Sequence, residues 1–460
     1  MKVKEIGSLN KLLLSFIIFS VIFRFSLMNV NKGYWWDEAV YLGLSRNLNQ
    51  NLQFGIPPPV ESYRPLLLPI LISSTAALFN DETGARIVVL SFSILSIVCT
   101  FFLGKRLYDE PTGLLSAMLL GVNHLFLFYG QRIFTESIFI TFYTMSLLFF
   151  FSGVEKNRNH LLFAAIFTGL CVLTKNFGVF LPITFSTYIL LRKRFEIFRY
   201  WQTYASILVC FLVLLPLFYF AFTNYGGIEG FLWAQSENVP ALNNYVGFYV
   251  IEFFDVFLAA GIFILFGLYS LIRRRKPSDV LVLTSLFIPL LFLGTILAYH
   301  KEARYLIPFF PTFFLAGAVS IDSFRKRSKK ATVILIIALL ALSFVRGSYW
   351  VQNNVSTGVA LGDACLYLRT ITGSNGTVIS ESYPYVYYFA GINYISPPSD
   401  KALFYQTISE KNIRFVLICY SEPGNPQYLE EELQTGKFEK VKGFMNEHRI
   451  EEAAIYRYHG

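Results

Sequence analysis

Long apolar runs alternate with short polar segments along most of the chain. A membrane-spanning helix needs about 20 predominantly apolar residues. Eleven runs are predicted to be such helices: 12–30, 86–104, 112–129, 137–153, 160–174, 177–191, 202–222, 247–271, 279–299, 304–321 and 331–350. The further run 65–79 is short, begins with Pro65 and contains Pro69, so it is predicted to be a re-entrant or interfacial helix. The first run lacks a small-residue cleavage site and is predicted to be a retained span.

The basic residues predict the orientation of these spans. With the N-terminus inside, the clusters at 105–106, 156–160, 192–194, 273–276 and 325–330 all lie on the cytoplasmic side. If 65–79 were a full span, every later cluster would lie outside. The pattern therefore predicts eleven spans, a cytoplasmic N-terminus and a C-terminus on the outer face.

The composition supports a polytopic membrane protein. Hydrophobic residues make up 54% of the chain, charged residues only 15%, and the mean hydropathy is +0.50. The net charge of +9 comes from short clusters between apolar runs, which excludes a nucleic-acid partner as its explanation. The five cysteines form no disulfide framework, and no Cys and His residues have metal-ligand spacing.

The last 110 or so residues differ from the rest of the chain. Alternating runs at 377–380 and 415–418 predict strands, and 428–433 predicts a helix. Both N-x-S/T sequons, at Asn354 and Asn375, fall in this tail, which agrees with an outer location. The predicted architecture is an α-helical membrane domain at 1–350, with a first outer loop at 31–85, and a small extracytoplasmic α/β domain at 351–460.

An acidic pair follows the first span directly. Asp37 and Glu38 come immediately after Trp35 and Trp36, at the expected membrane boundary. One interpretation is an aromatic belt followed by a helix that Asp37 caps, with Glu38 in its first turn. The other is a site that handles a polar substrate at the bilayer surface. Glu136 has the same two interpretations, because it opens a predicted span.

Further charges lie at the predicted outer ends of spans. Charge near membrane depth is costly, so several such residues on one face indicate a polar cavity or a substrate path. Carboxylates there suit a general base or a divalent cation, and cations suit a phosphate headgroup. The alternative for the cations is interfacial anchoring. His300 is predicted to form a local hydrogen bond. The set comprises Asp37, Glu38, Arg64, Arg132, Glu136, Lys175, Lys301, Glu302 and Arg304.

This arrangement resembles the GT-C glycosyltransferases, and among them the protein O-mannosyltransferases and the lipid A aminoarabinose transferases. The resemblance covers nearly all of the membrane part, and five short segments carry it. They are WDEAVY at 36–41, YRPL at 63–66, RIFTE at 132–136, LTKNFG at 173–178 and RYLIPFFP at 304–311. The chain departs from the family pattern where Tyr63 replaces the zinc-binding Glu of the aminoarabinose transferases and where Asn176 replaces Gly.

The resemblance implies a site and a reaction. Asp37 would be the catalytic base, with Glu38 and Glu136 as the other catalytic acids. Arg64, Lys175, Arg304 and Arg132 would contact the lipid phosphate, and Tyr41, Tyr63, His300 and Tyr305 would contact substrate. No metal site is assigned, although Asp37 and Glu136 would be the ligands if a divalent cation bound. The implied partners are a polyprenyl-phosphate-linked sugar, membrane lipids, and a glycan, protein or lipid acceptor.

Two other functions fit parts of the pattern. A transporter or flippase for a lipid-linked sugar also needs intramembrane charges and a headgroup pocket. However, the chain shows no internal repeat, and its charges gather at one face rather than at the bilayer centre. A receptor with an outer sensing domain would not need eleven spans. The sequence therefore favours the enzyme.

Overall fold

The computed structural model describes residues 3–28, 30, 32–56, 64–237, 242–296, 300–354, 358–373, 375–420 and 425–460. The chain divides into two compact units. The helical unit comprises Met1–Met28, Tyr63–Leu68 and Arg86–Val351. The mixed unit comprises Asn29–Ser62, Pro69–Ala85 and Gln352–Gly460.

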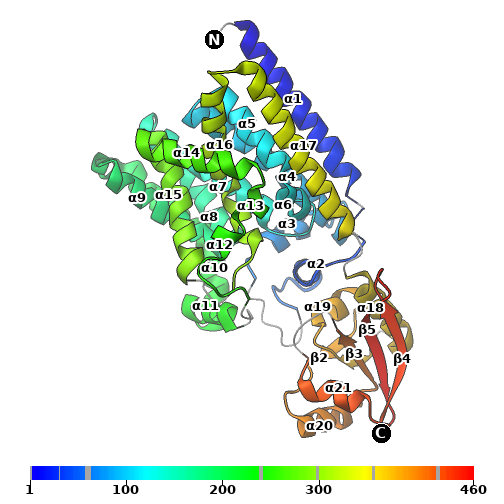
Figure 1. The fold of residues 1–460 in the computed structure, drawn as a ribbon. Coiled ribbons are helices and arrows are strands. Elements are labelled where there is room, and N and C mark those ends of the chain that lie inside the picture. Colours follow the sequence, from blue (N-terminus) through cyan, green and yellow to red (C-terminus); the bar gives the residue numbers. More distant parts are fainter. Residues whose placement is uncertain are drawn as a thin grey trace. The chain divides into compact units, whose positions relative to one another are not determined.

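The helical unit consists of packed helices without a sheet among its described residues (Figure 1). Its elements are α1 (Val3–Ser26), most of α4 (Asp81–Leu107), α5 (Glu110–Val122), α6 (His124–Tyr129), α7 (Glu136–Glu155), α8 (His160–Thr174), η1 (Asn176–Val179), α9 (Phe180–Leu191), η2 (Phe195–Arg199), α10 (Trp201–Tyr225), α11 (Ile228–Glu237), α12 (Phe248–Ile251), α13 (Phe253–Phe257), α14 (Ala260–Arg274), α15 (Pro277–Leu291), η3 (Phe292–Ile296), η4 (Ala303–Phe309), α16 (Phe310–Arg325) and nearly all of α17 (Lys329–Asn353).

These helices account for the predicted apolar runs. In the described ranges, six helical segments are long and apolar enough to cross a membrane: Asp81–Leu107, Glu136–Glu155, Trp201–Tyr225, Pro277–Thr295, Ala303–Arg325 and Lys329–Asn353. Shorter apolar helices cover Glu110–Val122, His160–Thr174 and Asn176–Leu191. The run 65–79 forms only α3 (Leu67–Thr75), which at nine residues is too short to span a bilayer. The total of eleven spans stays a prediction.

Two predicted runs are broken, each for a local reason. The run 112–129 divides at Asn123, whose side chain accepts a hydrogen bond from the Phe126 N–H at 3.1 Å and so caps α6. The run 247–271 divides into α12, α13 and α14, and Leu258 between the last two has a left-handed φ of 50°. Short polar and left-handed breaks of this kind do not interrupt hydrophobicity, so hydropathy does not reveal them.

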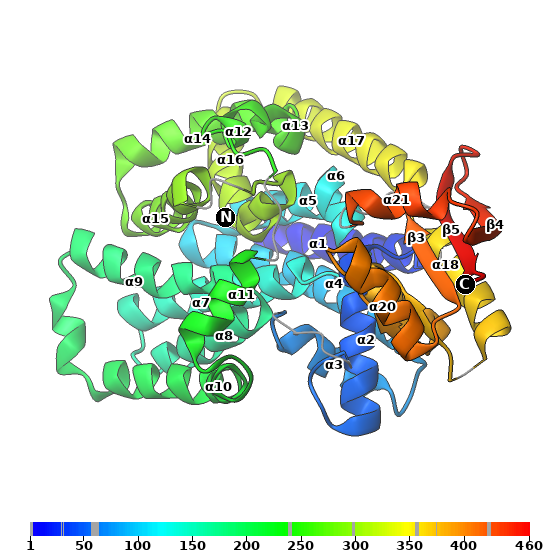
Figure 2. The same cartoon turned by 90° about the horizontal axis from the view of Figure 1, so that it is seen from below.

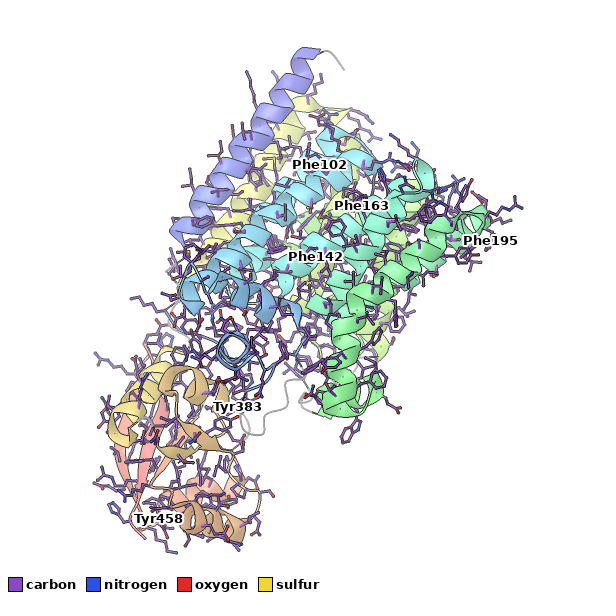
Figure 3. The ribbon with its side chains drawn as sticks, turned by 180° about the vertical axis from the view of Figure 1, so that it is seen from behind. Phe102, Phe142, Phe163, Phe195, Tyr383 and Tyr458 are labelled. Carbon is purple, nitrogen blue, oxygen red and sulfur yellow. The ribbon has the colours of Figure 1, made fainter. Side chains whose placement is uncertain are left out.

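Aromatic side chains fill the spaces between neighbouring helices of this unit. Phe142 on α7 stacks on Phe167 of α8 with ring centroids 6.1 Å apart, and Phe149 stacks on the same ring at 5.5 Å. Figure 2 shows α7, α8 and α10 running side by side, and Figure 3 shows Phe142 and Phe163 within this layer. Between α1 and α17, Phe23 and Phe344 lie 4.8 Å apart. The high phenylalanine content therefore serves helix–helix packing.

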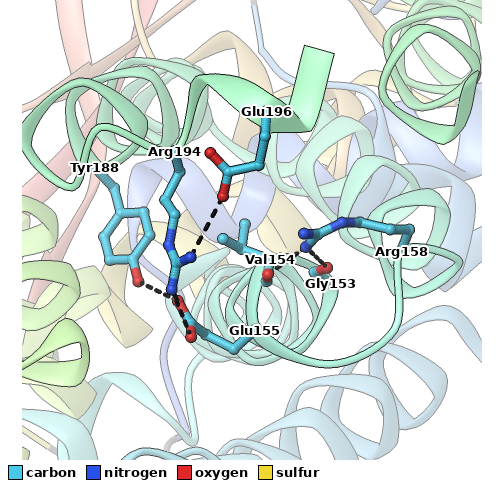
Figure 4. Close-up of polar contacts among 7 residues, drawn as sticks. All are labelled: Gly153, Val154, Glu155, Arg158, Tyr188, Arg194 and Glu196. Atoms are coloured by element: carbon cyan, nitrogen blue, oxygen red, sulfur yellow. Dashed lines mark hydrogen bonds and ion pairs between the residues drawn. The ribbon is translucent and has the colours of Figure 1, made fainter. Parts of the chain in front are cut away.

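A polar network ties α7 to α9 at one end of the unit (Figure 4). Arg194 Nη2 lies 3.1 Å from each carboxylate oxygen of Glu155, and the Tyr188 hydroxyl donates to Glu155 Oε1 at 3.2 Å. Arg158 donates to the Gly153 carbonyl at 2.7 Å, at the C-terminal end of α7. Cations there satisfy free carbonyls and oppose the helix dipole. Two of the clusters predicted to be cytoplasmic thus have a structural role.

The mixed unit holds a five-stranded sheet of order β2-β1-β3-β5-β4. Its strands are β1 (Thr377–Ile379), β2 (Asn393–Ile395), β3 (Phe415–Cys419), β4 (Phe438–Met445) and β5 (Glu451–Tyr458). Pairs β1–β2 and β1–β3 are parallel, whereas β3–β5 and β4–β5 are antiparallel. The other elements of this unit are α2 (Trp36–Asn51), most of α3, α18 (Val359–Thr372), α19 (Tyr383–Tyr385), η5 (Val386–Ala390), α20 (Lys401–Lys411) and α21 (Gln427–Leu433).

Helices cover both faces of the sheet. Phe404 and Ile408 of α20 and Leu429 of α21 pack with Val416 and Ile418 in one core. On β4, Phe444 instead contacts Tyr367 of α18, with ring centroids 5.9 Å apart. Every residue of β3 is buried, as expected for a central strand covered on both sides. This confirms strands at 377–379 and 415–419, where the sequence predicted them.

The first-loop segment belongs to the same unit as the C-terminal residues. The Tyr385 hydroxyl donates to the Tyr34 carbonyl at 2.7 Å, across 351 residues of sequence. Gly358, with φ of +83°, passes so close to Tyr34 that an added Cβ would lie 2.0 Å from its carbonyl oxygen. Only glycine satisfies both conditions. The predicted boundary at 350/351 and the outer location of the tail stay predictions.

Close packing of α14 on α16 yields the first testable prediction. A Cβ added at Gly267 would lie 1.9 Å from the Ala316 carbonyl oxygen, a backbone atom that cannot move aside. We expect Gly267→Ala to lower the free energy of unfolding by roughly 1–3 kcal/mol, the usual cost of overpacking. Thermal unfolding in detergent measures the change. Gly294→Ala is the matched control, because no heavy atom lies within 4 Å there. An equal melting temperature for both variants would contradict the close approach.

Candidate functional site

A buried ion pair joins two segments of the helical unit. Glu136 is the first residue of α7 and is 1% exposed. Lys175, between α8 and η1, donates from Nζ to Glu136 Oε1 at 3.0 Å. An unpaired carboxylate at this depth would be strongly unfavourable. Glu136 therefore opens a helix, as one interpretation of the sequence expected, and also pairs with a residue of another segment. Its role in handling a polar substrate stays a prediction.

The second carboxylate oxygen of Glu136 is still able to accept a hydrogen bond. Oε2 is buried, and within the described ranges it has no hydrogen-bond partner. A buried acceptor of this kind is normally satisfied by water or by a ligand. It could therefore accept a hydrogen bond from a substrate hydroxyl.

Aromatic rings surround the Lys175 ammonium. Its Nζ lies 5.1 Å from the ring centroids of both Phe177 and Tyr305, and these two rings meet edge to face at 5.5 Å. Cation–π attraction strengthens where water is excluded. The rings and Glu136 together hold the ammonium in one place.

A second charged group lies at the start of η4. Glu302 contacts Arg304 Nε at 2.6 Å and His300 Nε2 at 2.9 Å. Burial opposes ionisation of Glu302, but the hydrogen bond from His300 and the charge of Arg304 outweigh it and lower its pKa. Arg304 also lies 5.8 Å from the Tyr305 ring centroid. Tyr305 thus lies against both Lys175 and Arg304, and His300 forms the local hydrogen bond predicted for it.

Two further cations of this region are fully buried. Lys301 is 0% exposed and donates from Nζ to the Tyr245 carbonyl at 2.9 Å. Arg132 is 0% exposed and lies 5.2 Å from the Phe128 ring centroid. The sequence placed Lys301 and Glu302 among the boundary charges but gave them no role. Their position in the sequence between His300 and Arg304 could have indicated that they belong to the same site.

These groups form one charged cluster, which we call the boundary cluster. Its members are Arg132, Glu136, Lys175, Lys301, Glu302 and Arg304. Tyr129 lies within electrostatic range of Arg304, Glu302, Glu136 and Arg132, which places those four charges around one hydroxyl. Four cations against two carboxylates leave an excess of positive charge. That balance suits a phosphate or diphosphate group. Arg64, which is half-buried, belongs to the same compact unit.

The acidic pair of the first loop lies in the mixed unit. Trp35 precedes α2 in an extended conformation, and its backbone N–H donates to Glu38 Oε2 at 2.8 Å. Glu38 is 0% exposed, whereas Asp37 is half-buried. The predicted capping role therefore falls to Glu38 rather than Asp37. Tyr41 is buried one turn further along α2.

The start of α2 packs against the turn that follows β1. Trp36 meets Tyr383 of α19 edge to face, with ring centroids 5.1 Å apart. Glu381 lies two residues before this tyrosine, and burial raises the pKa of its carboxyl to about 7. A carboxyl that titrates near neutrality was not expected from the sequence, because its cause is tertiary.

The predicted site residues thus fall into two groups. Arg64, Arg132, Glu136, Lys175, His300, Arg304 and Tyr305 belong to the helical unit, and Asp37, Glu38 and Tyr41 to the mixed unit. Tyr63 lies outside the described residues. The described side chains nowhere gather three His, Cys, Asp or Glu residues suited to hold a metal ion.

Comparison with known proteins identifies the fold. Residues 63–220 match the family described as dolichyl-phosphate-mannose-protein mannosyltransferase. No curated protein sequence matches the chain. The similarity to solved structures is therefore one of fold at low sequence identity.

Three solved structures illustrate that similarity. ArnT from Cupriavidus metallidurans bound to undecaprenyl phosphate is 12% identical, with a TM-score of 0.75 over 96% of this chain and 97% of that one. The Archaeoglobus fulgidus oligosaccharyltransferase in complex with Zn and sulfate is 13% identical, with a TM-score of 0.66 over 88% and 67%. The arabinofuranosyltransferase AftD from Mycobacteria is 13% identical, with a TM-score of 0.61 over 98% and 40%. These findings confirm the predicted resemblance to GT-C glycosyltransferases and a multi-pass membrane protein.

The buried ion pair generates a prediction about stability. Replacing Lys175 by Met leaves the Glu136 carboxylate buried without its partner, which costs about 3–5 kcal/mol. The double variant Lys175→Met/Glu136→Gln should recover part of this loss, giving a coupling energy of about 0.5–3 kcal/mol in a double-mutant cycle. Denaturant unfolding of the purified protein provides the four free energies. The pair Lys105–Glu110, at 3.2 Å, has an exposed lysine; it is the control and should couple by less than about 1 kcal/mol. Similar coupling in both pairs would refute a special role for burial.

Glu381 generates a prediction about pH. Its folded pKa lies above the unfolded value, so its contribution to stability is present below about pH 4.5 and is lost as pH rises through about 7. Glu381→Gln should therefore stabilise the protein at pH 8 and leave it nearly unchanged at pH 4.5. After allowing for partial exposure we expect about 1 kcal/mol. Melting temperatures across this range measure the difference. The exposed Glu430→Gln should show no such trend, and a pH-independent effect at Glu381 would contradict its burial.

Proposed function

We propose that this chain, whose fold is that of the GT-C glycosyltransferases, transfers a sugar from a polyprenyl-phosphate carrier to an acceptor. The observation that carries the proposal is the boundary cluster, in which four buried or partly buried cations face two carboxylates at the ends of apolar helices. A phosphate that remains tethered to a lipid needs its counter-charges at that depth. The structures of similar fold include one bound to undecaprenyl phosphate.

The proposed reaction is an inverting displacement at the anomeric carbon. A base removes the proton from an acceptor hydroxyl or amine, and the acceptor atom forms a bond to the anomeric carbon. The bond from that carbon to the phosphate oxygen breaks, and the electron pair leaves with the polyprenyl phosphate. Negative charge therefore develops on the phosphate as the bond breaks. Cations held in place before the reaction stabilise that charge most effectively.

Asp37 is our candidate for the base. Its neighbour Glu38 uses its carboxylate to cap α2, which supports giving the proton transfer to Asp37. General-base catalysis by a positioned carboxylate typically increases the reaction rate by about 10²- to 10⁴-fold. The carboxyl would return its proton to solvent after the product leaves.

The boundary cluster supplies the remaining roles. Lys175 and Arg304, with Arg64 and Arg132, would contact the phosphate, and each is a stronger partner for an anion when water is excluded. Glu136 would orient a substrate hydroxyl through Oε2, while its Oε1 keeps Lys175 in place. His300 and Tyr305 would line the donor site, and Tyr41 would contact substrate from α2.

The orientation in the membrane is part of the proposal. The basic clusters support a cytoplasmic N-terminus, with the boundary cluster and the C-terminal residues on the outer face. The donor would then be consumed on that face, where lipids, proteins and glycans are available as acceptors.

The central prediction concerns Asp37. Purified protein in lipid should release sugar from radiolabelled polyprenyl-phosphate monosaccharides in the presence of acceptor, and Asp37→Asn should lower the rate by about 10²-fold or more. The variant must still insert into the membrane and keep the wild-type melting temperature. Asp363→Asn, an exposed aspartate of α18 in the same unit, is the matched control and should remain fully active. Full activity of Asp37→Asn would remove the proposed base.

The same preparation tests the metal-independent mechanism. Turnover should survive EDTA, because no step above requires a cation. Loss of turnover in EDTA, with recovery on adding a divalent ion, would contradict that mechanism. Translocation of the intact headgroup across vesicles without sugar release would favour a flippase instead.

A further inference from the structure

A cavity in the mixed unit lies away from the start of α2. Its volume is about 330 Å³, within the roughly 300–1,000 Å³ typical of small-molecule sites. It is lined by Arg46 and Gln50 from the end of α2, Arg369 from the last turn of α18, Tyr387, and Asn393 at the start of β2. All of these residues belong to one compact unit. None of the described side chains lining this cavity is acidic.

Arg46 is held in place by three contacts, which leave its Nη2 donor available. Its Nε lies 3.2 Å from Asp81 Oδ2, its Nη1 donates to the Tyr388 carbonyl, and its guanidinium stacks 3.9 Å from the Tyr388 ring centroid. These contacts use two of its three nitrogens, which leaves Nη2 for a ligand. An arginine fixed in this way loses little entropy when it binds an anion.

Arg369 provides the second cation, and its charge is not neutralised. Within the described ranges its guanidinium has no ion pair or side-chain hydrogen bond, and the residue is exposed. The dipole at the end of α18 favours a cation at this position. That explains the presence of an arginine there without a carboxylate partner, and its fork remains available for bidentate binding of an anion.

The other lining groups indicate what carries the anion. Gln50 and Asn393 present amides, each of which both donates and accepts, and Tyr387 presents a half-buried ring and hydroxyl. Amides match the hydroxyls of a sugar, and a ring matches its apolar face. A site for a bare inorganic anion would need neither the amides nor the volume.

We propose that this cavity binds an acidic sugar, with Arg46 and Arg369 on its carboxylate or phosphate and the amides on its hydroxyls. The binding itself does not depend on the reaction. That the acidic sugar is part of the acceptor rests on the proposed function, and would make the enzyme a transferase for acidic glycans.

Equilibrium binding to the full-length protein tests the proposal without the lipid donor. Isothermal titration uses glucuronate, glucose 6-phosphate, glucose and inorganic phosphate as probes. At least one acidic sugar should bind more tightly than both glucose and phosphate, and the tighter of the two acids identifies the anion. Equal binding of inorganic phosphate would reduce the cavity to a simple anion site, and no binding of either acid would overturn the proposal.

Variants locate the binding site. Arg369→Gln should lower the affinity for the acidic sugar about 10- to 100-fold, the usual effect of losing one charge-assisted contact. Arg369→Lys should recover part of that affinity. Arg414→Gln removes an exposed arginine of the same unit outside the cavity and should bind as wild type does. Asn393→Asp should weaken binding at an unchanged melting temperature. Unchanged binding in both Arg369→Gln and Asn393→Asp would overturn the assignment.

The outcome separates this proposal from the proposed function. If the protein binds acidic sugars through Arg369 but transfers no sugar to any acceptor, the binding site in the cavity is supported and the proposed transferase activity is contradicted. If transfer occurs and the Arg369→Gln variant retains the wild-type KM for an acidic acceptor, the transferase activity is supported and the role of the cavity in binding the acceptor is contradicted.

Discussion

Burying the Glu136 carboxylate at the first residue of an apolar helix costs free energy, and the Lys175 ammonium at 3.0 Å offsets that cost. The pair fixes the turn between α8 and η1 against the start of α7, and Tyr305 then packs against the same ammonium. Through Tyr305 the constraint extends to Arg304 and Glu302. Charge compensation in a dry environment thus determines how three segments far apart in sequence come together.

The two units solve different physical problems. The helical unit satisfies its backbone polar groups within helices, as a segment surrounded by lipid must, and uses aromatic stacking and close glycine contacts for packing. The mixed unit uses a sheet covered by helices on both faces, which buries β3 completely. In the boundary cluster of the helical unit, Arg132 and Lys301 are fully buried, and Lys175 and Arg304 form ion pairs. Arg369 in the mixed unit is exposed instead and has no ion-pair partner among the described residues.

Hydropathy was enough to predict most helices, because an apolar run depends on local composition alone. It could not predict the breaks at Asn123 and Leu258, which are single-residue effects. The boundary charges were recognised from their positions, but the pairing of Glu136 with Lys175 and the role of Glu38 as a cap depend on three-dimensional contacts. The grouping of residues 29–62 and 69–85 with the C-terminal residues was also beyond reach, because no local pattern records contacts across more than 300 residues.

That last feature has a consequence for how the protein is made. Tyr34 binds Tyr385 across 351 residues, and Arg46 binds the Tyr388 carbonyl across 342. At a synthesis rate of about 5–20 residues per second, the early segment waits roughly 20–70 s for its partners to be translated. During that interval the residues of α2 that pack against α19 and η5 lack those native contacts. A chaperone on the side of the membrane where this segment emerges, or temporary contact with the lipid surface, would protect it until translation ends.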